Sequence, residues 1–216
     1  MNKIIIFLLC VAGALLNIVT SRFSFSVMFL DTIWTISATL LAGPFWGALT
    51  GLLTNVIVHS LQFWGWEGYL FALCNMATAL ITYLFMRLFP RELSLESWRE
   101  AAYDSNVAPQ SRRFALVIGR IIVLILLSFA LAVAISVLGG LISALIQIFN
   151  PARIGTPDLS PEKFFGMFAP GFSLILKEIL VRIPMNMLDR PISAFAGYGI
   201  AFGLLRLYKK MKKGNA

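Results

Sequence analysis

Three polar side chains interrupt apolar segments and are candidates for binding a small solute. Asn55 and His59 are four residues apart, so on a helix they share one face. Asn75 lies near the start of the next apolar segment and could face the same cavity. A solute site in a membrane needs such polar groups on otherwise apolar helices. Hydrogen bonding between helices is the alternative explanation for Asn55 and His59.

Charged residues in or beside apolar segments are the second group of candidates. They are Asp31, Lys177, Glu178 and Arg182. A charge inside a membrane segment is a functional hypothesis by default. Glu178 and Arg182 are four residues apart and can form an ion pair within one helix, which leaves Lys177 to meet an anionic group on the solute. The alternative is that residues 164–183 lie at the membrane surface with their charges in water.

The sequence around Pro184 predicts a helix start, with Asn186 as the capping residue. The nearby Asp189 and Arg190 could pair with each other, with Asp31 or with a solute.

The aromatic and sulfur-containing candidates also have ordinary explanations. Trp64 and Trp66 could close over a solute cavity, but tryptophan between two spans is also typical of a membrane anchor. Cys10 and Cys74 both lie in apolar runs, which indicates small packing residues and not a disulfide or a metal site. Glu67 is expected to be a solvated loop carboxylate.

The sequence lacks the motifs of an enzyme or a self-powered pump. It contains no phosphate loop of the form G-x-x-x-x-G-K-[ST], no H-E-x-x-H and no G-x-S-x-G. Paired intramembrane carboxylates, as in a proton relay, are not seen in the sequence either. We therefore expect no catalytic residues, no metal and no cofactor in this chain.

The elements that must position these residues are membrane helices. Hydrophobic residues make up 59% of the 216 residues and charged residues 13%, against roughly 25% charged in soluble domains. The mean hydropathy is +0.84. No Asp, Glu, Lys or Arg occurs in residues 4–21, 32–66, 68–86 or 121–152. Such runs are long enough to cross a bilayer, where the backbone must be helical or form a closed barrel. No alternating barrel pattern is present.

The sequence therefore predicts one all-α transmembrane domain, a bundle of about six spans. The spans are predicted at residues 4–20, 28–42, 45–62, 69–89, 114–138 and 186–207.

Two longer connections separate these spans. Residues 90–113 are predicted to form a cytoplasmic loop, with a short surface helix that includes Leu95 and Trp98. Residues 150–184 are predicted to form an external loop or a partly inserted helix, and Gly139-Gly140 is expected to bend or end the fifth span.

The net charge of +8 fits a membrane topology better than nucleic-acid binding. With both termini and residues 87–120 in the cytoplasm, most of the 18 basic residues lie inside. An even number of spans follows, and we expect a multi-pass protein of the cell (inner or plasma) membrane.

One stretch of the sequence resembles a known family. Residues 30–61 contain a Gly43-Pro44 turn followed by a Gly47-x-x-x-Gly51 helix. This pattern is similar to the second and third helices of the S components of energy-coupling factor (ECF) transporters. The layout of the whole chain is also similar, with six spans, a basic C-terminus and no ATPase motif.

The resemblance implies a function and a set of partners. An S component binds a vitamin or similar micronutrient near the external face. It associates with a transmembrane coupling subunit and two cytoplasmic ATPases, whose ATP hydrolysis drives release of the solute inside. In this family a stripe of small residues on the first helix meets the coupling subunit. Here Cys10, Gly13 and Ala14 occupy that place. Packing inside the chain, between the first and third spans, is the alternative.

Two other functions remain open at the level of the sequence. The chain could be a membrane sensor or regulatory module whose 90–113 segment or tail contacts a signalling partner. It could also be a permease or channel for a small solute that works without partners.

Overall fold

The structure is a computed structural model that describes residues 3–23, 30–62, 66–95, 109–149, 171 and 173–214. Every regular element in these ranges is helical, which confirms the predicted all-α class. The helices are α1 (Lys3–Phe23), α2 (Ile33–Ala42), α3 (Pro44–Gln62), the 3-10 helix η1 (Trp66–Phe71), α4 (Ala72–Leu88), α6 (Pro109–Phe149), α8 (Leu174–Leu180) and α9 (Arg182–Gly214). The predicted surface helix around Trp98 and most of the 150–184 connection lie outside the described residues.

Three helical segments in the described ranges are long and apolar enough to cross a membrane. They are Lys3–Thr20, Glu67–Leu88 and Phe114–Phe149, with mean hydropathies of 2.3, 1.6 and 3.1. Large apolar side chains such as Ile125 and Phe129 project from α6 and are more than half exposed. Water does not favour such a surface but lipid does, so the chain is a membrane protein. The number of spans stays a prediction.

Helix α2 is shorter than the span predicted over residues 28–42. Its ten residues reach about 15 Å, half of a hydrocarbon core about 30 Å thick. Residues 24–29 lie outside the described ranges, so whether this segment crosses the bilayer stays a prediction.

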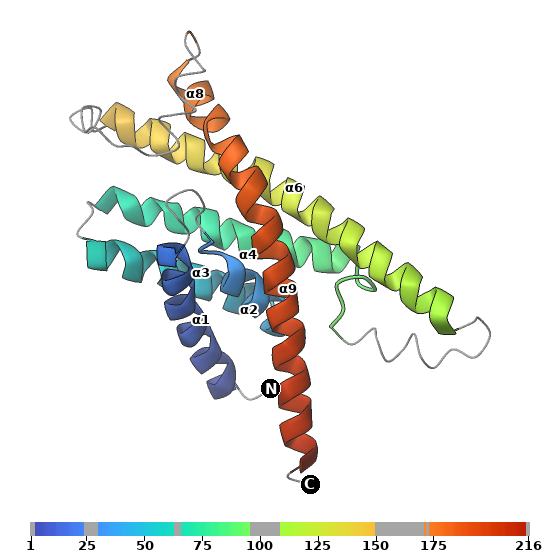
Figure 1. The fold of residues 1–216 in the computed structure, drawn as a ribbon. Coiled ribbons are helices and arrows are strands. Elements are labelled where there is room, and N and C mark those ends of the chain that lie inside the picture. Colours follow the sequence, from blue (N-terminus) through green and yellow to red (C-terminus); the bar gives the residue numbers. More distant parts are fainter. Residues whose placement is uncertain are drawn as a thin grey trace.

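Helix α2 nevertheless occupies the centre of the bundle. It packs against α1, α3, α4 and α9. Helices α3 and α4 run side by side in opposite directions, and α9 crosses α6 (Figure 1). The apolar core between them includes Ile36, Leu127, Leu131 and Tyr198.

The sequence predicted that Gly139-Gly140 would bend or end the fifth span. The helix does not end there, because α6 continues through both glycines to Phe149. The physical reason is a close helix crossing. A Cβ atom on Gly140 would lie 2.7 Å from both the backbone N and the Cα of Ile179. The absence of a side chain therefore lets α8 approach α6, as small residues do between membrane helices.

The Gly47-x-x-x-Gly51 face of α3 serves the same purpose. A Cβ atom on Gly51 would lie 3.0 Å from the backbone carbonyl carbon of Asn75 in α4, and one on Gly47 would collide with Thr39 in α2. Thr50 and Thr54 donate their hydroxyl groups to carbonyls one turn earlier in α3. This interface is thus tight and its hydroxyl groups are satisfied within the helix.

Asn17 joins three helices near the end of α1. Its Nδ2 donates to Thr54 Oγ1 at 3.1 Å and to Thr35 Oγ1 at 3.4 Å. Its Oδ1 accepts a hydrogen bond from the Trp34 backbone N at 3.0 Å. Asn17 is fully buried, so all of these bonds form away from solvent.

Replacing Asn17 by alanine is expected to lower the free energy of unfolding by about 2–3 kcal/mol, because the Trp34 amide loses its acceptor inside the bundle. Thermal unfolding in detergent, followed by circular dichroism, measures the loss. The matched control is Ser60→Ala, which removes an exposed 3.1 Å contact with the Tyr69 hydroxyl and should change stability by less than about 0.5 kcal/mol. Equal effects of the two substitutions would contradict the assignment of Asn17 as a buried link between helices.

Candidate functional site

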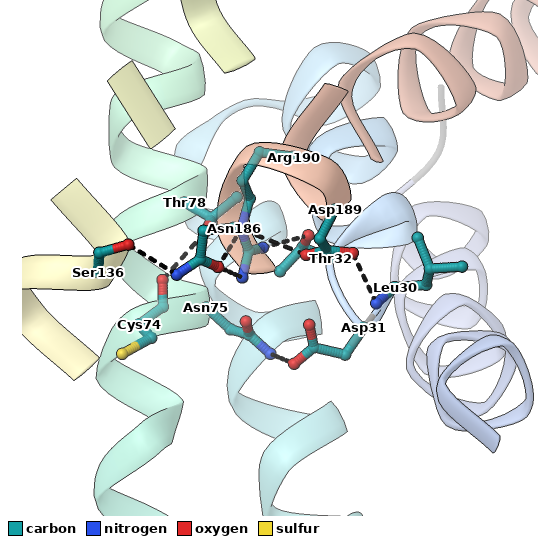
Figure 2. Close-up of polar contacts among 10 residues, drawn as sticks. All are labelled: Leu30, Asp31, Thr32, Cys74, Asn75, Thr78, Ser136, Asn186, Asp189 and Arg190. Carbon is teal, nitrogen blue, oxygen red and sulfur yellow. Dashed lines mark hydrogen bonds and ion pairs between the residues drawn. The ribbon is translucent and has the colours of Figure 1, made fainter. Parts of the chain in front are cut away.

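A cluster of polar side chains, buried except for the half-buried Asp31, lies between α2, α4, α6 and α9, at the start of α2 (Figure 2). We call it the central polar cluster. It comprises Asp31, Thr32, Asn75, Ser136, Asn186, Asp189 and Arg190.

Arg190 is the centre of this cluster and is 3% exposed. Its Nη1 donates to Thr32 Oγ1 at 2.7 Å. Its Nε and Nη2 donate to Asn186 Oδ1 at 3.2 and 3.1 Å. The Nε atom also lies 3.4 Å from Asp189 Oδ2. The structure contains the Asp189–Arg190 pair, one of the pairings that the sequence left open, and pairing with a solute stays a prediction.

Asp189 is fully buried and connects α9 to the segment before α2. Its Oδ1 accepts a hydrogen bond from the Leu30 backbone N at 2.9 Å. Leu30 has a positive φ of 40°, a conformation that non-glycine residues adopt only when their surroundings hold them there. The Asp189 bond is one such restraint, and the bond from Thr20 Oγ1 to the Leu30 carbonyl at 2.8 Å is another.

Asp31 and Asn75 form the second part of the cluster. Asn75 Nδ2 donates to Asp31 Oδ2 at 2.9 Å. In the described structure Asp31 Oδ1 is buried without a hydrogen-bond partner. Asp31 also acts electrostatically on Asp189, so the fold brings two carboxylates together. The sequence could not show this pair, because 158 positions separate its members.

Asn186 does not cap a helix, and that prediction is wrong. Helix α9 begins at Arg182, so Asn186 lies inside its second turn. Its Nδ2 donates to Ser136 Oγ on α6 at 2.9 Å, and its Oδ1 accepts from Arg190. Pro184 falls in the first turn of α9, where a backbone N–H has no partner within the helix, so the helix can start before the proline.

A second group of polar side chains, the outer polar cluster, joins α6 to α8 and the start of α9. Arg182 Nη1 lies 2.8 Å from Glu178 Oε2, as the spacing of four residues predicted. Arg182 Nη2 donates to Ser143 Oγ at 2.7 Å, and Gln147 Nε2 donates to Glu178 Oε1 at 2.8 Å. Lys177 is half-buried beside Glu178.

Comparison with known proteins gives no match to a family model, to a curated protein or to a solved structure.

The two clusters meet near Cys74. A Cβ atom on Gly139 would contact both Arg182 Cδ, at 3.4 Å, and Cys74 Sγ, at 3.7 Å. Asp31, Arg190 and Arg182 all act electrostatically on this thiol. Polar and charged groups from five segments of the chain therefore converge in one part of the bundle.

Asn55 and His59 are both buried on α3. They lie one turn apart on the same side of the helix, as their spacing of four residues predicted. Asn55 Nδ2 donates to the Gly51 carbonyl of its own helix at 3.2 Å. The His59 ring lies directly beneath Gly68, where a Cβ atom would come within 2.5 Å of Nδ1. It also meets the Tyr69 ring edge to face at 6.0 Å. His59 is therefore held by η1.

The loop candidates are only partly described. Trp64 lies outside the described residues, and of Trp66 only the backbone is described, as the first residue of η1. Glu67 is 6% exposed, so the expectation of a solvated carboxylate is wrong. It is buried because η1 folds back on the ends of α3, α4 and α6.

The three candidates for partner contact pack inside the chain. Cys10 Sγ donates to the Trp46 carbonyl of α3 at 3.6 Å, and Ala14 is fully buried. A Cβ atom on Gly13 would lie 3.2 Å from Trp34 Cβ in α2. These contacts agree with the alternative explanation, in which the small residues of α1 pack inside the chain. The opposite face of α1, with exposed Leu8 and Leu15, faces away from the bundle.

A cavity of about 380 Å³ lies at the other end of α2 from the central polar cluster. It is lined mostly by apolar side chains, among them Leu40, Met86, Leu93 and Leu205. None of the predicted site residues lines it.

Sequence reasoning missed Thr32 and Ser136 as members of the central polar cluster. Serine and threonine are common in membrane helices, where they bond to their own backbone, so their type carries no signal. The signal is their position opposite Arg190 and Asn186, which only the fold supplies.

Proposed function

We propose that the chain is a multi-pass protein of the cell (inner or plasma) membrane that binds a vitamin or similar micronutrient. In this proposal it is the substrate-specific subunit of an ATP-driven importer of the ECF type. The observation that carries the proposal is the central polar cluster, in which charged and polar groups from α4, α6, α9 and the residues just before α2 converge inside an apolar bundle.

Charged groups inside a membrane protein are costly, and such groups mark solute or ion pathways more often than they improve stability. Asp31, Asp189 and Arg190 come from opposite ends of the sequence and meet here. A stable apolar bundle needs none of them, which favours a functional reason for their presence.

The position of the cluster fits recognition from outside the cell. It lies near the end of α1 and the start of α9, through the Thr20–Leu30 and Leu30–Asp189 bonds. The start of α1 and the end of α9 lie together at the opposite end of the bundle (Figure 1). If both termini are cytoplasmic, as the basic residues favour, the cluster belongs to the external half.

The partners in this proposal are a transmembrane coupling subunit and two cytoplasmic ATPases, because the sequence contains no ATPase motif of its own. The exposed apolar face of α1, which includes Leu8 and Leu15, is available to a coupling subunit or to lipid.

The test is the identity of a small molecule bound to the isolated protein. The full chain is purified in detergent, denatured, and the released molecules are identified by mass spectrometry. We expect a stoichiometric micronutrient, and we expect ATPases and a coupling subunit to co-isolate from native membranes. A protein that stays empty and that no micronutrient stabilises against heat would overturn the proposal.

Vesicles that contain this chain alone separate the importer from the permease. An importer subunit without its ATPases should accumulate no solute, whereas a permease should equilibrate it across the membrane. Solute uptake by such vesicles would reject the importer model but keep a transport function.

A further inference from the structure

The central polar cluster contains three buried oxygen atoms without a hydrogen bond in the described structure. They are Asp31 Oδ1, Asp189 Oδ2 and Ser193 Oγ. Ser193 is fully buried and lies one turn after Asp189 on the same face of α9. The Ser193 hydroxyl is placed to donate to the Asp189 carboxylate, and Asp31 acts on that carboxylate through its charge, so the three groups are neighbours. Buried polar atoms are nearly always satisfied, and an unsatisfied group calls for a specific explanation such as a water or an ion.

The charges of the cluster do not balance. Two carboxylates, Asp31 and Asp189, face one guanidinium, that of Arg190. Outside this cluster, Arg182 is paired with Glu178 at 2.8 Å, and Lys177 lies beside that pair. An uncompensated charge in a low-dielectric interior is strongly unfavourable, and a single positive charge would remove the imbalance.

The guanidinium of Arg190 cannot reach further. Its Nη1 is bonded to Thr32, and its Nε and Nη2 are bonded to Asn186. The amide of Asn75 is bonded to the other oxygen of Asp31. Asp189 Oδ2 has the Arg190 Nε atom at 3.4 Å and the Ser193 hydroxyl as neighbouring donors, whereas Asp31 Oδ1 has no hydrogen-bond partner in the described structure.

We infer that this part of the central polar cluster binds one monovalent alkali cation, held by the oxygen atoms of Asp31, Asp189 and Ser193. Carboxylate and hydroxyl oxygens are hard donors that suit such ions. The ligands in this proposal are two carboxylates and one hydroxyl. A single charge neutralises the cluster, whereas a divalent ion would leave an excess of positive charge.

The inference does not depend on the proposed import function, because an ion would occupy these oxygens equally in a sensor or a permease. The test therefore uses the purified full chain with salts alone, without solute or partner subunits. Thermal unfolding in detergent is measured while NaCl, or KCl in a parallel series, replaces N-methylglucamine chloride at constant ionic strength. We expect saturable stabilisation, by about 5 °C at a tenfold excess over the dissociation constant.

Asp31→Asn is the decisive variant. The asparagine side chain has the same shape and keeps an oxygen for Asn75, but it removes the negative charge. We expect at least a tenfold weaker apparent affinity for the ion. Ser193→Ala keeps both carboxylates and should weaken the affinity several-fold, and it serves as a second variant if Asp31→Asn folds poorly.

Glu92→Gln is the matched control, because Glu92 lies in the turn after α4, near Gly119 and next to the cavity residue Leu93, at the other end of α2 from the ion site. Its carboxylate acts on Arg120 and not on the central polar cluster. The ion response of Glu92→Gln should equal that of the unmodified chain. Equal stabilisation by N-methylglucamine and alkali ions, or an unchanged response in Asp31→Asn and Ser193→Ala, would overturn the inference. Stability that changes with pH but not with the alkali ion would do so too, since a proton would then fill the site.

Discussion

Replacing Arg190 by methionine is expected to lower the free energy of unfolding by about 3–5 kcal/mol, because it leaves Asp189 buried without its cation. Asp189 is fully buried and lies 3.4 Å from the Arg190 Nε atom. The substitution also removes the donors to Thr32 and Asn186. Thermal unfolding in detergent should show a fall in Tm of about 10 °C or more.

A double substitution separates the lost charge from the lost packing. Asp189→Asn together with Arg190→Met removes both charges and keeps an oxygen that can accept from the Leu30 amide. Most of the lost stability should return, since a neutral replacement of a buried ion pair is often tolerated. Arg87→Met, at an exposed position in the last turn of α4, should change stability by less than about 1 kcal/mol. If Arg87→Met and Arg190→Met were equally harmful, burial of the pair would not explain the effect.

Replacing Gly51 by leucine is expected to destabilise the bundle by about 3 kcal/mol. Even a Cβ atom at this position would lie 2.9 Å from Asn75 Cβ and 3.1 Å from the Asn75 carbonyl oxygen. Because the backbone of α4 cannot move aside locally, α3 and α4 must separate. The same movement displaces Asn75 from Asp31. We therefore expect the thermal stabilisation by alkali ions to weaken as well.

Gly199→Leu is the matched control for Gly51→Leu. Gly199 also lies inside a long helix, but a Cβ atom there would meet nothing within 4 Å. Leucine favours a helix more than glycine does, so stability should stay unchanged or rise by up to about 1 kcal/mol. Comparable losses at Gly51 and Gly199 would show that any side chain is harmful in these helices and would contradict close helix approach as the cause.

Local spacing predicted some contacts of the site well. The ion pair of Glu178 and Arg182 depends only on a separation of four residues in a helical segment, and the structure contains it at 2.8 Å. The shared face of Asn55 and His59 follows from the same geometry. What these residues contact could not be predicted, since the Gly68 backbone that covers His59 belongs to another element.

Residues that mark the ends of helices in soluble proteins gave wrong or incomplete predictions. Gly139-Gly140 was expected to bend or end a span, but α6 continues because its glycines accommodate the α8 backbone. Asn186 was expected to cap a helix, but it lies within α9 and bonds to Ser136. In both cases a neighbouring helix, and not the local sequence, decides what the residue does.

The sequence by itself determined that the chain is a helical membrane protein. Long runs without charge must lie in lipid, and in lipid only a helix or a closed barrel satisfies the backbone.

Only the tertiary structure decided which polar groups meet. Asp31 and Asp189 are 158 positions apart, and nothing periodic in the sequence relates them. They become neighbours because α2 and α9 pack together at the centre of the bundle. The central polar cluster is therefore a property of how the helices pack, since contacts between distant segments depend on the relative positions of whole helices and not on local spacing.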